Sequence, residues 1–259
     1  MATIPVDGAT LHVRCDGDRR RPAVLLSNSL GTDLSMWDAQ AAVLSLRFHV
    51  VRYDTRGHGG SSAPPGPATI AQLGADVLAV LDHLDIGRAH FVGLSMGGVI
   101  GQWLGAHAPE RLDKLVLANT ASRIGTPDGW RERAAAVRAH GMGEIAAGAP
   151  ARWFTADFAA RQPVLVGSMQ KTLRAQSPDG YAACCEALMD ADLTMQLSRI
   201  VAPTLVIAGA CDPVTTVAHA RSLAAGIAGA RLVGLQASHL SNLEAPDRFT
   251  GALNDFLSA

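Results

Sequence analysis

The most constraining feature of the sequence is an alternation of short apolar runs with longer segments of helical periodicity. In a first block, up to about residue 120, the apolar runs lack a two-residue alternation, as buried parallel strands do. The segments between them place apolar residues at helical spacing. This order predicts an α/β fold with right-handed crossovers. The strand-like runs are PAVLLSNS, FHVVRYD, AHFVGL and LDKLVLAN, and the helical segments are MWDAQAAVLSL, TIAQLGADVLAVLDHL and MGGVIGQWLGAHA.

A second block of the same kind begins at about residue 203. Strand, helix, strand and helix follow in that order, as APTLVIAGACD, VTTVAHARSLAAGI, ARLVGLQASH and EAPDRFTGALNDFLS. Residues 122–196 contain no convincing strand, only helical segments broken by Gly and Pro. We therefore expect a mostly parallel sheet with helices on both faces, built from residues 1–121 and 197–259. Residues 122–196 are expected to form an inserted helical cap, and the alternative is a run of ordinary surface helices.

Charge and composition exclude several classes of partner. The formal net charge is −1 and Lys and Arg form no long run, so nothing in the sequence favours binding to nucleic acid or to an anionic membrane. No segment has the order of a signal peptide or the apolar length of a membrane span, and we expect a cytoplasmic protein. The histidines lack ligand spacing, so no metal is expected. Reduced, buried thiols are expected for Cys15, Cys184, Cys185 and Cys211.

The hexapeptide GLSMGG at residues 93–98 is a candidate nucleophile turn. It follows the apolar run AHFV and precedes a predicted helix, and this strand-turn-helix context is the one in which a G-x-S-x-G serine is exposed. Gly93 and Gly97 suit such a turn, because larger residues would collide with the adjacent strand and helix. We therefore predict that Ser95 is a nucleophile. The alternative is that packing simply requires a small residue there.

A serine nucleophile needs a base and an orienting acid, which in this kind of fold follow it in the order Asp or Glu, then His. Asp212 comes directly after the run TLVIAGAC, and His239 follows LVGLQAS. Because parallel strands end at the same edge of a sheet, the three side chains should converge there. His239 would accept the serine proton, and Asp212 would orient the imidazole. Each could instead be an ordinary loop residue, and the alternative acids are Asn119, Asp190 and Asp192.

Acyl transfer by a serine also needs an oxyanion hole, usually made of two backbone N–H groups. Met96 should supply one of them, since it follows Ser95 at the start of a helix, where the peptide dipoles favour negative charge. The second is expected from Leu30, in the loop after VLLSN. Ser29 and Asn28 lie beside Leu30 and could add hydrogen bonds from their side chains.

Several segments together resemble the α/β-hydrolase superfamily over nearly the whole chain: SNSLGTDLSMWD, RYDTRGHGGSSAP, GLSMGGVIGQWL, CDPVT and ASHLSNLEAP. Within that superfamily the sequence is similar to the bacterial 3-oxoadipate enol-lactonases, on SNSLG and on IGTPDGW, RWFT and GYAACCEAL in the cap. The resemblance implies hydrolysis of 3-oxoadipate enol-lactone to 3-oxoadipate in aromatic degradation, through an acyl-enzyme and without metal or organic cofactor.

The substrate that this resemblance implies also carries a free carboxylate, which needs a cationic or polar anchor in an apolar pocket. Arg133 is the favoured anchor, with Trp130 and Trp153 beside the substrate, because they lie in the cap segments GWRER and RWFT that resemble the lactonases. Ser29 is expected to contact the substrate from the sheet domain. The alternative for Arg133 is an exposed helical charge.

Other proteins on the same scaffold would share most of these residues. A carboxylesterase, a cofactor-free perhydrolase and a C–C bond hydrolase are the enzymatic alternatives, and a non-catalytic ligand-binding protein is the alternative of another class. The interpretation that we carry forward is a serine hydrolase that opens a small-molecule lactone.

Overall fold

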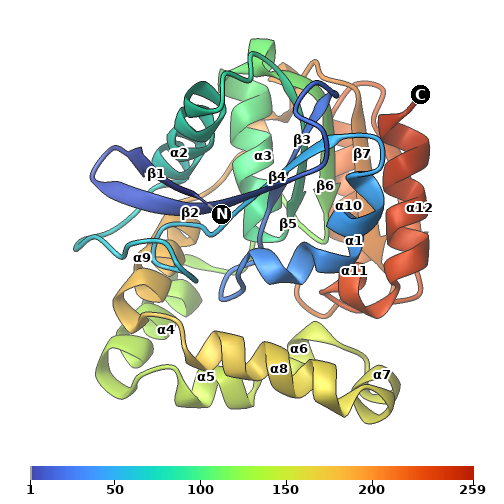
Figure 1. The fold of residues 1–259 in the computed structure, drawn as a ribbon. Helices are drawn as coiled ribbons and strands as arrows, with labels where there is room; N and C mark the ends of the chain where they lie inside the picture. Colours follow the sequence, from blue (N-terminus) through green and yellow to red (C-terminus); the bar gives the residue numbers. More distant parts are fainter. Residues whose placement is uncertain (1) are drawn as a thin grey trace.

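The computed structural model describes residues 2–259, which form an eight-stranded sheet in the order β1-β2-β4-β3-β5-β6-β7-β8 (Figure 1). All pairings from β4 to β8 are parallel, which confirms the predicted mostly parallel sheet. The two antiparallel pairings, β1 with β2 and β2 with β4, lie at one edge. The strands are β1 Ala2–Val6, β2 Ala9–Asp16, β3 Ala23–Ser27, β4 His49–Tyr53, β5 Ala89–Leu94, β6 Leu112–Ala118, β7 Thr204–Gly209 and β8 Arg231–Leu235.

Helices cover both faces of the sheet. On one face α1 packs against α12, and on the other α2 packs against α3, which contacts β5 and β6 (Figure 1). These helices fall where the apolar spacing predicts them. Their bounds are α1 Asp38–Leu44, α2 Ile70–His83, α3 Met96–His107, α10 Val217–Gly226, α11 Ser241–Glu244 and α12 Pro246–Leu257, and the short 3-10 segments are η1 Leu34–Trp37, η2 Pro109–Arg111 and η3 Thr194–Arg199.

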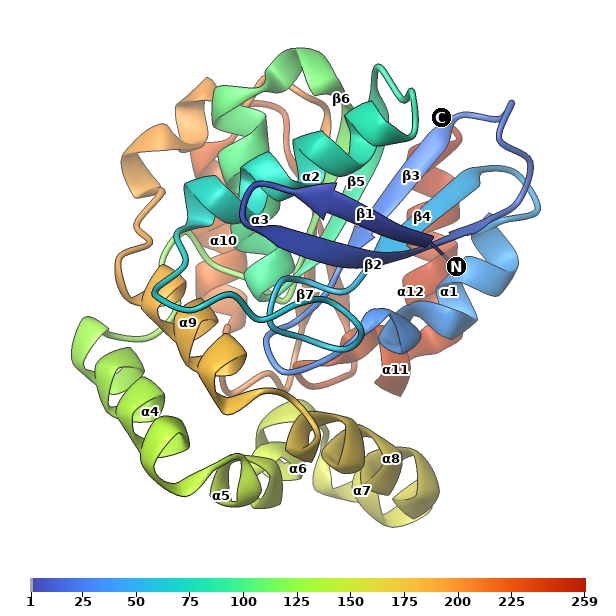
Figure 2. The same ribbon diagram turned by 60° about the vertical axis from the view of Figure 1, so that its left-hand side comes forward.

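Between β6 and β7 the chain forms the helices α4 to α9, which lie beyond one end of the sheet and which we call the cap (Figure 2). Residues 119–203, all of them described, contain no strand. The helix α4 packs along α9, and α8 packs against α5, α6 and α7. The cap helices are α4 Pro127–His140, α5 Gly143–Ala147, α6 Ala149–Trp153, α7 Ala156–Arg161, α8 Pro163–Arg174 and α9 Pro178–Met189.

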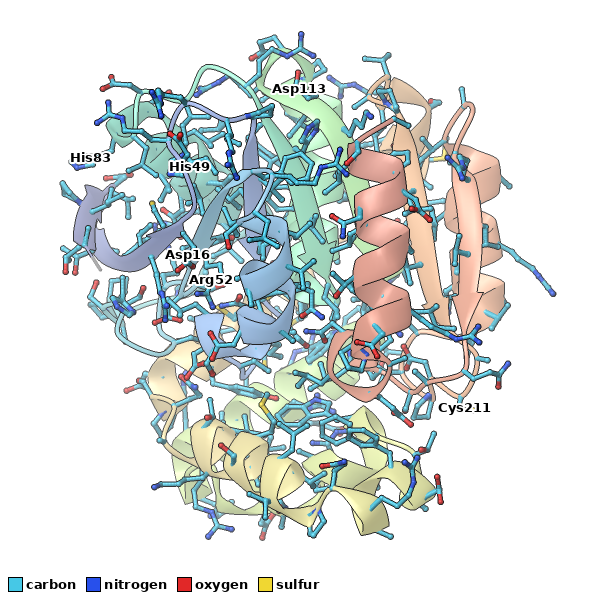
Figure 3. The ribbon with its side chains drawn as sticks, turned by 45° about the vertical axis from the view of Figure 1, so that its right-hand side comes forward. Asp16, His49, Arg52, His83, Asp113 and Cys211 are labelled. Atoms are coloured by element: carbon cyan, nitrogen blue, oxygen red, sulfur yellow. The ribbon has the colours of Figure 1, made fainter. Side chains whose placement is uncertain are left out.

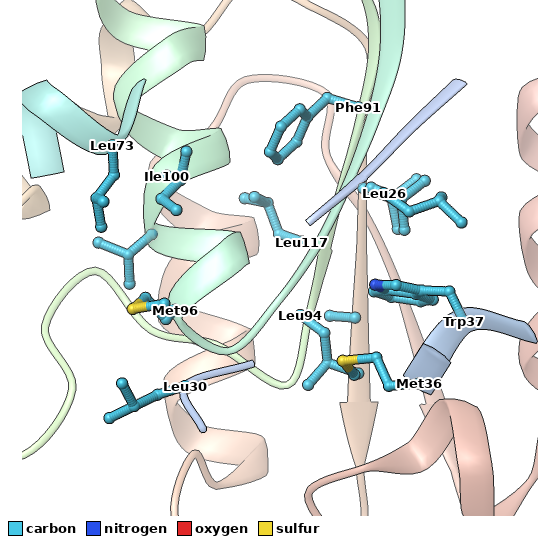
Figure 4. Close-up of a cluster of buried hydrophobic side chains, with 14 of the residues drawn as sticks. Leu26, Leu30, Met36, Trp37, Leu73, Phe91, Leu94, Met96, Ile100 and Leu117 are labelled. Atoms are coloured by element: carbon cyan, nitrogen blue, oxygen red, sulfur yellow. The ribbon is translucent and has the colours of Figure 1, made fainter. Parts of the chain in front are cut away.

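The hydrophobic core lies between the sheet and its helices. Leu26 of β3, Phe91 of β5 and Leu117 of β6 are buried side by side with residues of the covering helices (Figure 4). Every residue of β3, β4, β5 and β7 is buried. Burial on both faces explains why these strands are continuous apolar runs in the sequence rather than alternating ones.

An ion pair holds the antiparallel strand β2 to the parallel sheet. Arg52 of β4 is only 1% exposed, and its guanidinium lies 2.6 Å from the carboxylate of Asp16 on β2 (Figure 3). The hairpin before it turns at Gly8, whose φ is +68°. A left-handed glycine suits such a two-residue hairpin turn.

The cysteines depart in part from the prediction. Cys184 and Cys185 are buried on α9, as expected, but Cys15 on β2 and Cys211 in the loop after β7 are exposed (Figure 3 labels Cys211). Among the helices of residues 2–259, none combines the length and the apolar character that crossing a bilayer requires.

Candidate active site

Ser95 lies at the turn between β5 and α3. Its backbone has φ 57° and ψ −115°, a left-handed conformation that is strained for a side chain other than glycine. A Cβ atom at Gly93 would lie 2.1 Å from the carbonyl oxygen of Gly97, and one at Gly97 would lie 2.3 Å from that of Ser27. Only glycine therefore fits at these two positions. Between them, Ser95 is the residue of the turn whose side chain carries a hydroxyl group.

The side chains of Ser95, His239 and Asp212 form one hydrogen-bonded line. The Nε2 atom of His239 lies 2.9 Å from Oγ of Ser95, and its Nδ1 atom lies 2.8 Å from Oδ2 of Asp212. A carboxylate can only accept, so Nδ1 carries the proton and Nε2 accepts from the serine hydroxyl. All three residues are buried, at 6%, 3% and 5% exposure. The arrangement can move the serine proton to the imidazole while the carboxylate stabilises the cation.

The carboxylate of Asp212 accepts five hydrogen bonds. Oδ1 accepts from the backbone N–H groups of Val214 (2.7 Å) and Thr215 (3.0 Å). Oδ2 accepts from His239, from the hydroxyl of Thr215 (2.7 Å) and from Nδ2 of Asn119 (3.0 Å). Burial alone would raise the pKa of Asp212, but the hydrogen bond and charge of His239, with the bonds from Asn119 and Thr215, outweigh it and lower the pKa to about 2.

This lowered pKa predicts an acid-dependent contribution to stability. An unfolded aspartate titrates near about 3.9, so the unfolded chain binds this proton more tightly than the folded chain does. The stabilisation is therefore complete above about pH 5 and is lost as the pH falls towards 2, with a size on the order of 2 kcal/mol. Urea unfolding of the wild type and of Asp212→Asn should show a difference in unfolding free energy that shrinks over this window. A difference that stays constant from pH 6 to pH 3 would contradict the assignment.

Two backbone donors near Ser95 are free, one in the loop after β3 and one in the residue that follows the serine. The N–H groups of Leu30 and Met96 donate to no acceptor within residues 2–259. The next amide along α3, that of Gly97, donates to the carbonyl oxygen of Asn28 at 3.1 Å and so ties this loop to the serine turn. Two unpaired N–H groups beside a nucleophile are what an oxyanion hole requires.

The side chain of Asn28 does not add a hydrogen bond to the candidate oxyanion hole, which the sequence analysis considered. Its Nδ2 donates to the carbonyl oxygen of Tyr53 at 2.8 Å, and its Oδ1 accepts from the indole N–H of Trp37 at 2.9 Å. Asn28 is completely buried and braces the loop from behind instead of facing a substrate. Ser29, its neighbour, lines the cavity described next.

A cavity of about 310 Å³ lies between the serine and the cap. It has the size and the mostly apolar lining of a small-molecule site. Ser95 and His239 line the cavity from the side of the sheet domain. Each residue predicted to contact a substrate also lines it. Those residues are Ser29, Trp130, Arg133 and Trp153, and the other walls include Leu30, Ile124, Thr126, Arg152, Leu173, Tyr181, Leu188 and Val214.

Two arginines of the cap face this cavity without a carboxylate partner. The guanidinium of Arg133 lies over the ring of Trp130, 4.8 Å from its centroid. Arg152 donates from Nη2 to the carbonyl oxygen of Ile145 at 3.0 Å. Neither arginine forms an ion pair with any residue from 2 to 259. Burial, and after it the charge of Arg133, lower the pKa of Arg152, so the two cations repel each other across a site that an anion would stabilise.

The sequence model of the alpha/beta hydrolase fold matches residues 22–246. The chain belongs to the α/β-hydrolase family. It is 49% identical to 3-oxoadipate enol-lactonase 2 of Acinetobacter baylyi, over 97% of this chain and 94% of that protein. The crystal structure of the enol-lactonase from Burkholderia xenovorans LB400 has 49% identity and a TM-score of 0.98, with all of both chains covered. A malate-bound thermophilic esterase of Thermogutta terrifontis has 28% identity and a TM-score of 0.94, over 99% of this chain and 97% of its own.

These comparisons confirm the predicted fold class of this α/β-hydrolase and its resemblance to the enol-lactonases.

None of the three alternative acids takes the place of Asp212 beside the histidine. Asn119, at the end of β6, donates to Asp212 instead of replacing it. Asp190 directly follows α9, and Asp192 pairs with Arg123 on the surface at 3.2 Å.

Sequence reasoning missed Arg152 in this α/β-hydrolase. The one available signal was its place directly before Trp153, within the segment RWFT. Tyr181, also missed, lies in the GYAACCEAL segment, and burial raises its pKa to about 12, so its hydroxyl stays neutral beside the arginines.

Proposed function

We propose that this α/β-hydrolase opens the ring of 3-oxoadipate enol-lactone to give 3-oxoadipate. The observation that carries the proposal is a hydrogen-bonded serine, histidine and aspartate next to a cavity. On the cap side, two arginines without a carboxylate partner line the same cavity. Identity of 49% to a 3-oxoadipate enol-lactonase supports the same substrate. We place the reaction in the cytoplasm, where exposed thiols such as Cys211 stay reduced.

In the first half of the reaction, Oγ of Ser95 attacks the lactone carbonyl carbon, and its proton passes to Nε2 of His239. The oxyanion that forms accepts hydrogen bonds from the N–H groups of Leu30 and Met96. The ring C–O bond then breaks, which leaves an ester of Ser95 and an enolate oxygen. An enolate is a better leaving group than an alkoxide, and it becomes the ketone after protonation by His239.

In the second half, His239 removes a proton from a water molecule, which attacks the ester carbonyl. The same two N–H groups hold the second oxyanion. When this intermediate collapses, Oγ of Ser95 leaves and takes back the proton from Nε2. The new carboxylic acid loses its proton to the solvent, so the product is released as a dicarboxylate and the enzyme returns to its starting protonation state.

The substrate carboxylate is proposed to lie against Arg133 and Arg152, while Trp130 and Trp153 cover the apolar part of the molecule. Charge-assisted hydrogen bonds to guanidinium groups are the strongest that a carboxylate can form in such a site. Arg133 is also held in place by its stacking over Trp130. This arrangement favours an anionic lactone over a neutral ester of the same size.

We expect Arg133→Ala and Arg152→Ala each to raise KM for the enol-lactone by about 10- to 100-fold, because each removes a hydrogen bond to a charged group worth about 1.5–3 kcal/mol. KM for the neutral ester p-nitrophenyl acetate should change little. Arg131→Ala is the matched control, since Arg131 is exposed on the same helix and pairs with Asp128. Equal changes for the lactone and the neutral ester would contradict the carboxylate-binding role.

The proposed function is tested directly by adding the enol-lactone and following the loss of its ultraviolet absorbance. Turnover of p-nitrophenyl acetate but not of the lactone would indicate a carboxylesterase instead. Labelling of Ser95 by an organophosphonate without turnover of either compound would indicate a ligand-binding protein. Rapid hydrolysis of the lactone that ends in 3-oxoadipate is the result that we expect.

A further inference from the structure

Glu244 connects two segments that the mechanism treats separately. It ends α11 and is half-buried between the loop that carries His239 and the start of the cap helix α7. Its Oε2 accepts from the backbone N–H of Ser238 at 2.9 Å and from that of Thr155 at 3.2 Å. Its Oε1 accepts from the hydroxyl of Thr155. One carboxylate thus holds three donors, one from the sheet domain and two from the cap.

These contacts and one more fix the backbone on both sides of His239. Ser238, which precedes it, is held by Glu244. Leu240, which follows it, donates its backbone N–H to the carbonyl oxygen of Trp153 at 3.0 Å. Trp153 lines the cavity, next to Arg152 and two residues before Thr155. Both chain neighbours of the histidine are therefore bound to the short cap segment 153–155, directly or through Glu244.

The chemistry of Glu244 fits this connecting role. No Lys or Arg from 2 to 259 forms an ion pair with it, so its charge is balanced only by the donors that point at it. A glutamine at this place could keep the three contacts, since its amide oxygen can accept from both N–H groups and its NH₂ group can donate to the hydroxyl oxygen of Thr155. An alanine would leave the three donors without this acceptor. A buried donor left without a partner is unfavourable, and the two segments would then shift apart.

We infer that Glu244 is a positioning residue that fixes the imidazole of His239 relative to the substrate-binding wall of the cap. This inference deepens the proposed function, on which it rests, because it concerns the same site. Catalytic groups must be held within about 0.5 Å of the productive geometry. Through Glu244, a displacement of the cap wall displaces the base, so substrate recognition and proton transfer are coupled.

The test is a double-mutant cycle on kcat for p-nitrophenyl acetate, a neutral ester that needs the base but not the arginines. Each kcat is divided by the number of active sites titrated with an organophosphonate, so that misfolded protein does not count. The variants are Glu244→Ala, Thr155→Val and the two together. We expect Glu244→Ala to lower kcat by about 10-fold or more, since small misplacements of a catalytic group are costly. Thr155→Val should lower kcat several-fold alone, but no further when Glu244→Ala is present.

Two further variants separate positioning from general stability. Thr155→Ser keeps the hydroxyl and should restore kcat to the wild-type value. Glu186→Ala is the matched control, because it removes another half-buried glutamate of the chain, one that pairs with Arg138 on the outside of the cap. It should leave kcat for the ester unchanged.

Additive losses in the cycle, or an unchanged kcat per active site in Glu244→Ala, would overturn the coupling. The outcome is independent of the substrate assignment. If the wild type hydrolyses the ester but not the enol-lactone, the proposed function fails while the cycle still decides the role of Glu244. If Glu244→Ala does not fold, Thr155→Val and Thr155→Ser alone carry the test, and equal kcat values for these two variants would contradict the inference.

Discussion

Replacement of Ser95 by alanine should lower kcat for the enol-lactone by about 10⁴-fold or more, and His239→Ala should have an effect of the same order. Ser95 supplies the hydroxyl on the strained turn, and within residues 2–259 His239 is the only group in hydrogen-bond distance of that hydroxyl that can take its proton. Initial rates measured by the loss of lactone absorbance, with each protein at the same folded concentration, give the comparison.

The double variant provides the control for this prediction. Because the two residues act as a unit, Ser95→Ala with His239→Ala should be little worse than either change alone. Neither substitution should alter the fold, since alanine fits both places. A single variant that keeps most of the wild-type activity would show that the nucleophile or the base has been assigned wrongly.

Asp212→Asn should lower kcat by about 10⁴-fold with little change in KM. The asparagine amide can present an N–H to Nδ1 of His239, so the ring takes the tautomer whose Nε2 carries the proton and cannot accept the one from Ser95. The loss of negative charge also removes the stabilisation of the imidazolium. The measurement is kcat and KM for the lactone from full saturation curves.

Asp192→Asn is the matched control for this change, because Asp192 is an exposed aspartate of the cap that pairs with Arg123. It should keep wild-type kinetics. Activity of Asp212→Asn within about 10-fold of the wild type would mean that another group orients the histidine, and Asn119, which also contacts Asp212, would be the first to examine.

The sheet and the three residues in line could be predicted because their signals are local. The parallel strands β5 and β7 are buried on both faces and so form apolar runs, which Ser95 and Asp212 follow. His239 follows β8, which is mostly exposed but still contains the apolar residues Leu232, Val233 and Leu235. The first hairpin lacks this signal. Its strand β2 alternates between buried and half-exposed positions and carries charged residues, so it does not stand out among the other segments.

Contacts between distant segments could not be predicted in the same way. Arg152 faces the substrate cavity because helix α6 is turned towards it by packing against α5 and α8, and that packing is not encoded in the tetrapeptide RWFT alone. Glu244 meets Thr155 across 89 residues of chain. Asn28 is drawn away from the site by Tyr53 and Trp37, neither of which is adjacent to it in the sequence.

The insertion of the cap between β6 and β7 has a consequence for how such proteins diversify. Because β6 and β7 run parallel, with Leu115 of β6 opposite Thr204 of β7, the chain leaves the sheet at the edge that carries Ser95 and re-enters it at the opposite edge. The insertion therefore includes a return segment with η3, which packs on α3 and α10. A cap of another length or sequence can replace α4 to α9 only if this return segment stays in place. The contacts of Glu244 set a condition on any such exchange. A foreign cap must supply hydrogen-bond donors for that carboxylate, because otherwise the imidazole of His239 would be displaced while the new cap changes the substrate.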